Sequence, residues 1–443
     1  MRYVGRGCLW KYWSPMLESS LTLPSGQTLK NRIAKAAMTE GLADSENRAT
    51  DRLAALYRRW GAGGAGLLLS GNIMVDRRYL ERPGNVAFDG PQSDDQLARI
   101  RAWTSAARES GADIWAQLSH AGRQTPKYVS REPVAPSSVA IDLPGDQFAP
   151  PRALEPDEIV DVVNRFATAA RTAKLGGFTG VQVHAAHGYL VSEFLNPRVN
   201  LRDDEWGGSL ENRARLLLRI VDAVRAQVGS GFTVSVKLNS SDFQNGGFAP
   251  GEAIQVARWL EAAGVDLIKV SGGSYEQPAM MDMDGLEARY EEQKRESTRA
   301  REAYFLDYAE EMRASVKTPL MVTGGFRTRE GMEAALASGA CDVIGVARPL
   351  CVDPDMPGKL LSGDIDRAPS YEKTLQIGPG VMGPASKFDI IRALNGFAAM
   401  SFFYENIFRL ADGKTGNEKM TLLPAFIRQQ RHEQKTAKNL RRV

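Results

Sequence analysis

The chain has 443 residues, of which 43% are hydrophobic and 25% charged, a balance typical of a soluble globular protein with a sizeable core. Its formal charge of +3 gives no reason to expect a nucleic-acid partner. The three cysteines, Cys8, Cys341 and Cys351, include no CxxC pair, so neither a disulfide framework nor an iron–sulfur cluster is predicted. We therefore expect a cytoplasmic protein.

The sequence does not predict a membrane anchor in residues 1–13 or in the stretch 393–404. The opening residues 1–13 are basic and aromatic but lack the apolar core of a secretory signal. The uncharged stretch 393–404 near the other end is too short to span a bilayer.

Short apolar runs rich in β-branched residues alternate with longer amphipathic stretches. Each short run predicts a strand that is buried on both faces, as in a parallel sheet. Eight strands are predicted, over residues 33–38, 66–71, 112–118, 180–184, 232–238, 266–271, 319–323 and 342–346. Seven helices are predicted between them, over residues 50–60, 93–110, 155–175, 209–228, 250–263, 299–315 and 328–338.

Eight strand–helix units predict an α/β fold of the (β/α)₈ TIM-barrel type, with a doubly wound sheet as the alternative because periodicity cannot show closure. The glycine-rich segment 61–66 follows a helix and precedes a strand, which is the wrong order for a Rossmann nucleotide site. We assign residues 1–14 to an N-terminal arm, 15–364 to the barrel and 365–443 to a C-terminal helical extension with a basic tail.

Two histidines and a tyrosine, His184, His187 and Tyr189, stand where the fourth predicted strand gives way to a loop. Residues three apart on a continuing strand would point to opposite faces, but Gly188 permits a turn that brings both imidazoles to one side. Neutral imidazoles beside a phenol suit a site that polarises a carbonyl oxygen and delivers a proton. A metal pair and ordinary core histidines are the alternatives. The spacing is not that of a helical zinc motif, and no metal site is predicted.

Other polar residues follow predicted strands at the barrel end where active sites lie. Lys237 could form a Schiff base or stabilise an anion on a cofactor, and Gln117 suits a heterocycle with an imide edge. Gly324, Gly325 and Arg348 stand where barrels bind phosphate, although a turn and a surface arginine would look the same. Together these residues indicate FMN across the barrel mouth.

The long segment 274–298 follows the sixth predicted strand. It mixes Met280, Met281 and Met283 with charged residues and is predicted to form a lid or rim of the mouth. A core role for these methionines is an equal alternative.

The chain also resembles the Old Yellow Enzyme, or NADH:flavin oxidoreductase (NADH oxidase), family of FMN-dependent barrels. The resemblance spans residues 15–360, in family order, and the part from 184 to 213 is the most specific. The matching segments are Leu29–Ile33, Ala36–Thr39, Gln117–Arg123, His184–Tyr189, Asn200–Arg213, Thr323–Phe326 and Val346–Arg348.

The resemblance implies an FMN-dependent enzyme that takes hydride from NADH or NADPH and passes it to the β-carbon of an α,β-unsaturated carbonyl compound. His184 and His187 would bind the carbonyl oxygen, and Tyr189 would protonate the α-carbon. Lys237 would stabilise the negative charge of reduced flavin. The remaining cofactor residues implied are Ala37, Met38, Thr39, Gly71 and Gln117 at the flavin ring and Gly324, Gly325, Ala347 and Arg348 at the phosphate. A flavin-dependent NAD(P)H oxidase or oxidative demethylase is the alternative function.

Three departures from the family pattern matter. Thr39 stands where one bacterial branch has a redox-tuning cysteine, and Gly41 where that branch has a substrate-binding tyrosine. The substrate shape and the flavin potential of this protein therefore cannot be inferred from that branch. Ala347 replaces a common glycine beside Arg348. The four-cysteine iron–sulfur motif of the larger relatives is missing, which argues against their electron-transfer chemistry.

The tail from about residue 365 lies outside the resemblance. Its apolar run near residues 397–403 and its basic end predict helices that pack on the barrel or on a partner subunit. We expect a homo-oligomer, and contact with an acidic membrane surface is the less favoured alternative.

Overall fold

The computed structural model describes residues 16–143, 146–274, 276 and 303–441. The N-terminal arm 1–14, Cys8 and the three methionines of the expected lid therefore lie outside the described residues.

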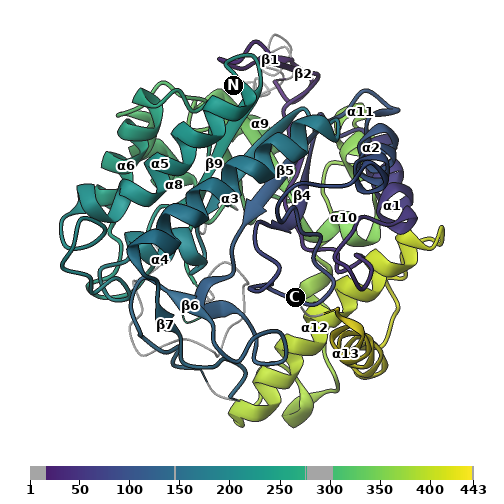
Figure 1. The fold of residues 1–443 in the computed structure, drawn as a ribbon. Coiled ribbons are helices and arrows are strands. Elements are labelled where there is room, and N and C mark those ends of the chain that lie inside the picture. Colours follow the sequence, from purple (N-terminus) through teal and green to yellow (C-terminus); the bar gives the residue numbers. More distant parts are fainter. Residues whose placement is uncertain (1–15, 144–145, 275, 277–302, 442–443) are drawn as a thin grey trace, which may run out of the picture.

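Eight parallel strands close into a barrel in chain order, and helices surround it (Figure 1). The fold class is confirmed, and the doubly wound alternative is wrong because the last strand pairs with the first. The strands are β3 (Ile33–Lys35), β4 (Leu67–Met74), β5 (Asp113–Ser119), β8 (Gly180–Ala185), β9 (Thr233–Asn239), β10 (Leu267–Ser271), β11 (Leu320–Thr323) and β12 (Val343–Val346).

Each of the seven predicted amphipathic stretches contains a helix, whereas the short helices over residues 190–195, 348–352 and 356–362 were not predicted. Ser209 caps its helix, since its side chain accepts a hydrogen bond from the backbone of Asn212. The helix expected over 299–315 begins only at Leu306, and residues 299–302 are not described. The helices are α1 (Asp51–Ala62), α2 (Asp94–Arg108), α3 (Pro156–Leu175), α4 (Leu190–Leu195), α5 (Leu210–Val228), α6 (Pro250–Ala262), α8 (Leu306–Arg313), α9 (Arg329–Ala337), α10 (Arg348–Val352) and α11 (Met356–Ser362).

Strand β4 contains a bulge that the apolar pattern does not predict. Three residue steps separate Leu69 from Asn72 on β4, whereas two separate Trp115 from Gln117 on β5. The extra residue disrupts the ladder locally and re-aims the side chains beyond it. Beyond the bulge, Asn72 Oδ1 accepts a hydrogen bond of 2.7 Å from Gln117 Nε2.

Buried polar groups satisfy the backbone atoms around this bulge. The Lys35 ammonium donates to the carbonyl oxygen of Leu69 at 2.6 Å, and the carboxylate of Glu40 accepts from the amide of Gly71 at 2.8 Å. Lys35 is fully buried, with Nζ 4.3 Å from the ring centre of Trp60. Since an unpaired buried backbone group is costly, these contacts stabilise the irregular end of β4.

A hairpin of β1 (Leu21–Thr22) and β2 (Thr28–Leu29) closes the N-terminal end of the barrel, at the top of Figure 1. The Ser25 and Thr233 hydroxyls lie 2.7 Å apart, and Trp115 Nε1 donates to Gln27 at 3.1 Å. This hairpin was not predicted, because its strands are too short to show a period. It leaves the opposite, C-terminal end of the strands for the site.

A second short pair, β6 (Val134–Ala135) and β7 (Arg152–Ala153), belongs to the loop after β5.

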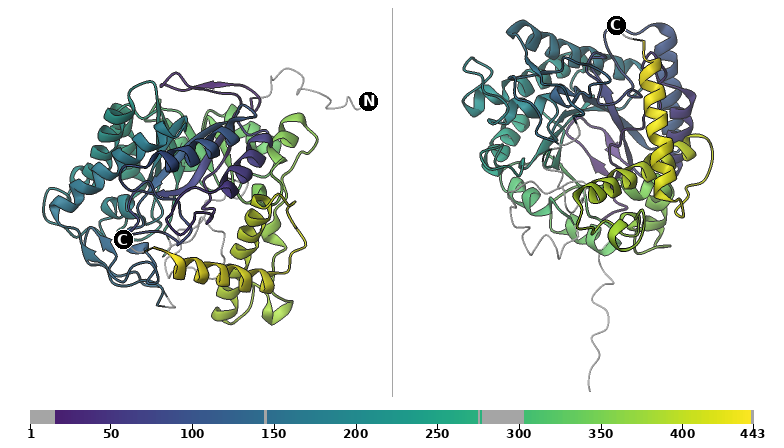
Figure 2. Two further views of the ribbon diagram at one scale, coloured as in Figure 1. Left: turned by 45° about the vertical axis from the view of Figure 1, so that its right-hand side comes forward. Right: turned by 90° about the horizontal axis from the view of Figure 1, so that it is seen from below.

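The C-terminal extension is helical, as predicted. Helix α12 (Asp389–Ala411) packs against α1 and α10, and α13 (Leu422–Asn439) packs against α12. Phe402 and Ile407 are buried in this contact region. Figure 2 shows both helices along one side of the barrel. Among the described residues, no helix has the length and apolar character needed to cross a membrane.

Candidate active site

A tight turn after β8 brings the two histidines and the tyrosine together. His187 and Gly188 adopt φ angles of +65° and +76°, so the chain reverses within two residues. The ring centres of His184 and His187 lie 5.1 Å apart, and those of His184 and Tyr189 lie 4.8 Å apart. The predicted turn is confirmed, but His187 itself shares the left-handed backbone with the glycine.

Hydrogen bonds from the end of β9 and from the segment after β5 hold this strained turn. The amide of His187 donates to Asn239 Oδ1 at 3.2 Å, and its carbonyl accepts from Gln124 Nε2 at 3.0 Å. A Cβ on Gly188 would lie 2.8 Å from Gln124 Oε1. The turn is therefore held from two sides, and a side chain at Gly188 would displace one of its supports.

Lys237 lies beside the histidines because β8 and β9 pair in register. His184 and Lys237 are partners across this ladder, and Lys237 Nζ lies 3.2 Å from His184 Nε2. Lys269 on β10 is in turn the register partner of Lys237. Two buried lysines and one buried imidazole thus occupy adjacent strands.

Burial and the lysines keep both imidazoles neutral. Burial is the main cause that lowers the pKa of His184 well below its ordinary value, and Lys237 lowers it further. Burial and then Lys237 also lower the pKa of His187. The pKa of Lys237 itself is lowered by burial and by Lys269. A neutral imidazole has one N–H to donate, as the predicted carbonyl-binding site requires.

Ser271 joins the cluster from the end of β10. Its hydroxyl lies 2.6 Å from His187 Nε2, and both residues are buried. Sequence reasoning missed Ser271, Lys269 and Asn239 as site residues. The signal for two of them was present, because Lys269 and Ser271 share one face of a strand otherwise made of apolar residues.

Two of the predicted flavin-ring residues are held by carboxylates. The Thr39 hydroxyl donates to Glu81 at 2.7 Å, and the amide of Gly71 donates to Glu40. A Cβ on Gly71 would lie 2.6 Å from the carbonyl oxygen of Met38, so only glycine fits there. Ala37 and Met38 lie in the same segment, which follows β3 directly.

The predicted phosphate residues form a separate group at the ends of β11 and β12. Gly324 and Gly325 have φ angles of +115° and +89°, which side chains rarely adopt. Thr323 pairs with Gly345, so the residues that follow them lie side by side. Ala347 and Arg348 come directly after β12. This group is separated from His184 by β9 and β10.

Two observations indicate that the residues present can accommodate FMN. Gln117 Oε1 and His184 Nδ1 are buried and have no hydrogen-bond partner in the described part of the chain. Unpaired buried polar atoms are costly and point to a missing partner. The glycines after β11 leave the backbone open to a phosphate, and Arg348 follows on the neighbouring strand.

Known proteins share this architecture. The chain matches the model of the NADH:flavin oxidoreductase / NADH oxidase family over residues 21–366. It is 40% identical over 361 residues to a Hypocrea jecorina (strain QM6a) protein named NADH-dependent flavin oxidoreductase iliE, which covers 76% of this chain and 86% of that protein.

Two solved structures show the same barrel. The old yellow enzyme homologue from Zymomonas mobilis superposes with a TM-score of 0.66 at 30% identity, covering 80% of this chain and 94% of that one. Morphinone reductase in complex with tetrahydroNAD superposes with a TM-score of 0.63 at 26% identity, covering 81% and 93%. The chain therefore belongs to the NADH:flavin oxidoreductase / NADH oxidase family and is an FMN-dependent NAD(P)H oxidoreductase of the Old Yellow Enzyme type.

Proposed function

We propose that the enzyme is an ene-reductase that reduces the activated C=C bond of α,β-unsaturated carbonyl compounds. The observation that supports this most directly is the cluster of His184, His187 and Tyr189. It combines two neutral, buried imidazoles with a phenol whose ring lies 4.8 Å from that of His184. An enone needs such a set, because its oxygen must be polarised and its α-carbon must receive a proton.

The chain offers a distinct group of residues for each part of FMN. Gln117, Lys237 and Gly71 within β4 would face the flavin ring, together with the residues after β3, namely Ala37, Met38 and Thr39. Gly324, Gly325, Ala347 and Arg348 would hold the phosphate. When bound, FMN would supply the hydride chemistry that links NADH or NADPH to the β-carbon of the alkene.

The protein's own groups then complete the reaction. An N–H from each of His184 and His187 would donate to the carbonyl oxygen and draw electron density from the C=C bond. The Tyr189 hydroxyl would deliver the proton to the α-carbon. Tyr189 is only 4% exposed, so bulk water is kept from competing with it. Lys237, whose Nζ lies 3.2 Å from His184 Nε2, would stabilise the negative charge at the flavin.

The test is an anaerobic titration of the FMN-loaded enzyme with NADH or NADPH, followed by cyclohexenone. The flavin absorbance should bleach with the nicotinamide and return with the enone. Tyr189→Phe should bleach at the normal rate but return roughly 100-fold or more slowly.

Unchanged reoxidation in Tyr189→Phe would remove that residue from the proton-donor role. If the enzyme consumes oxygen but reduces no enone, the NAD(P)H oxidase alternative is favoured. An oxidative demethylase would instead reduce its flavin with a methylated amine in the absence of nicotinamide.

We also propose a cytoplasmic homo-oligomer whose barrel occupies residues 15–364. The two described cysteines, Cys341 and Cys351, are buried free thiols, which is compatible with a reducing compartment. Sedimentation velocity of the full chain would measure the number of subunits, and a monomer at micromolar concentration would contradict the proposal.

A further inference from the structure

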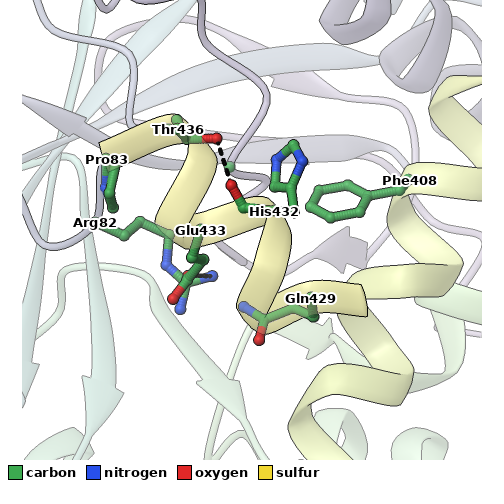
Figure 3. Close-up of a pocket in the computed structure, with 9 residues that line it drawn as sticks. Arg82, Pro83, Phe408, Gln429, His432, Glu433 and Thr436 are labelled. Carbon is green, nitrogen blue, oxygen red and sulfur yellow. Dashed lines mark hydrogen bonds and ion pairs between the residues drawn. The ribbon is translucent and has the colours of Figure 1, made fainter. Parts of the chain in front are cut away.

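The C-terminal helices reach the loops that follow β3 and β4. The backbone amide of Arg441, beyond the end of α13, donates to the carbonyl of Ser45 at 3.0 Å, and its guanidinium pairs with Glu46. A pocket between α13 and these loops is lined by Gly41 and Pro83 on one side and by His432 on the other (Figure 3). The extension therefore forms one wall beside the C-terminal end of the barrel.

Arg82 is a second charged residue, besides Arg441, that joins this wall to the barrel. Its guanidinium lies 4.1 Å from the ring centre of Tyr404 on α12, and Nη1 lies 3.4 Å from Glu433 Oε1 on α13. Its Nε lies 3.7 Å from Glu81 Oε1. Figure 3 shows Arg82 and Glu433 extending toward one another. Since the Arg82 side chain is only 18% exposed, these charges act through a medium less polar than water.

Glu81, the neighbour of Arg82, belongs to the candidate active site. Its Oε2 accepts from the Thr39 hydroxyl at 2.7 Å and from Asn72 Nδ2 at 3.0 Å, and Asn72 in turn accepts from Gln117. Glu81 also acts on the site electrostatically, because its charge opposes the lowering of the Lys237 pKa. A carboxylate with a 7% exposed side chain thus contacts one predicted flavin-ring residue, Thr39, directly and another, Gln117, through Asn72.

We propose that Glu81 and Arg82 are positioning residues through which α12 and α13 hold Thr39 and Asn72 beside the cofactor. The Thr39 hydroxyl has a single proton, which it donates in its hydrogen bond to Glu81. Thr39 therefore presents oxygen lone pairs, not a proton, to the flavin. Arg82 balances the buried carboxylate, and Glu433 with Tyr404 keeps Arg82 in place. The proposal rests on the assignment of the flavin to this mouth and not on the nature of the alkene.

The first experiment measures the midpoint potential of bound FMN in Glu81→Gln by spectroelectrochemistry. The neutral amide removes a negative charge, and its oxygen is a weaker acceptor than a carboxylate for the Thr39 proton, which becomes more available to the flavin; both changes favour the more negative, reduced cofactor. A positive shift in potential is expected. The shift should shrink when Glu81→Gln is introduced into Thr39→Val, which has no hydroxyl proton to release. Equal potentials in Glu81→Gln and wild type would overturn the role given to Glu81.

The second experiment measures hydrogen exchange in the cofactor-free full chain. Glu433→Gln should speed exchange several-fold at the amides of residues 39–47, because Arg82 loses its partner on α13. The matched control is Glu405→Gln, which removes a carboxylate from the same helix pair, 2.7 Å from Arg428 rather than beside Arg82. If the two variants exchange alike in residues 39–47, α13 does not act through Arg82.

These readouts separate the proposal from the ene-reductase function. Neither the potential nor hydrogen exchange uses an alkene, so an enzyme inactive on enones can still give both expected results. Conversely, full enone reduction with an unchanged potential in Glu81→Gln would leave the function standing and remove the positioning role. If Glu81→Gln does not fold, Glu433→Gln still tests the proposal. The Glu433 side chain is 20% exposed, so this substitution is expected to leave the fold intact.

Discussion

Lys237 Nζ lies 3.2 Å from Nε2 of His184, so a proton on one of these nitrogens disfavours a proton on the other. An ammonium group has no lone pair, and a charged Lys237 therefore requires Nε2 of His184 as its acceptor. The imidazole proton then resides on Nδ1, the buried atom without a hydrogen-bond partner among the described residues. With Lys237 charged, His184 therefore keeps one N–H, on Nδ1, directed away from the lysine.

Replacing Lys237 with methionine tests its proposed electrostatic role. Loss of the cation should lower the midpoint potential of bound FMN, because reduced flavin carries more negative charge. Spectroelectrochemistry of the loaded protein measures the shift. Lys30→Met is the matched control, since Lys30 donates to the carbonyl of Ser110 at an exposed position. A Lys237→Met potential equal to that of Lys30→Met would contradict the role.

The turn at His187 predicts a specific cost for a side chain at position 188. Gly188→Ala should lose roughly 1–2 kcal/mol of unfolding free energy from the left-handed backbone alone, and more from displacing Gln124. Gly208→Ala isolates the backbone cost, because Gly208 has φ +78° with no atom within 4 Å of a Cβ. Only Gly188→Ala should also slow enone reduction. Equal losses of stability and activity in the two variants would show that the contact with Gln124 is unimportant.

Gly71 is expected to be essential for binding FMN. A Cβ there would lie 2.4 Å from Glu40 Oε2 and 2.6 Å from the Met38 carbonyl oxygen, so the segment after β3 would have to move. Gly71→Ala should weaken FMN binding at least tenfold (about 1.4 kcal/mol), measured by quenching of flavin fluorescence on binding. Gly231→Ala, where a Cβ meets nothing within 4 Å, should bind FMN normally. Normal binding by both variants would move the cofactor away from Gly71.

The buried Lys269 predicts how stability depends on pH. Burial is the main cause that lowers its pKa from 10.5 to about 7, and Lys35 adds to the effect. The folded state therefore binds fewer protons than the unfolded state between pH 7 and 10.5, so stability should rise with pH across this window.

Lys269→Met should flatten that rise and stabilise the cofactor-free protein most below pH 7, where the folded wild type must bury the charge. Urea unfolding at pH values from 6 to 10 checks this, with Lys30→Met as the exposed control. A slope unchanged in Lys269→Met would show that this lysine is not the group responsible.

Most of the barrel could be predicted from local sequence patterns. Seven strand starts agree to within one residue with their apolar runs, and the eighth, β3, starts correctly but ends three residues early, at Lys35. Lys35 ends the ladder because the chain then leaves the sheet to form the segment that contains Thr39. The bulge in β4 was not predictable, since its freed backbone groups are satisfied by Lys35 and Glu40, which lie elsewhere in the sequence.

The candidate site likewise contains some residues that could be predicted from the sequence and others that could not. His184, Tyr189 and Lys237 could be identified because they stand at strand ends, where a barrel collects its chemistry. Glu81 could not, because nothing near it in sequence marks it, and Ser271 was missed although it shares one face of its strand with Lys269. They join the site only when β10 closes beside β9 and when the loop after β4 folds back onto Thr39.

Composition, periodicity and the residues after each strand were enough to predict an alternating α/β fold, FMN at its mouth and the histidine–tyrosine cluster, because these depend on short-range patterns along the chain. The closure of the barrel, the left-handed backbone of His187 and the neutral state of the imidazoles are properties of the folded chain. Each depends on groups distant in sequence. Desolvation, register and charge act on a residue only through the neighbours that folding brings to it.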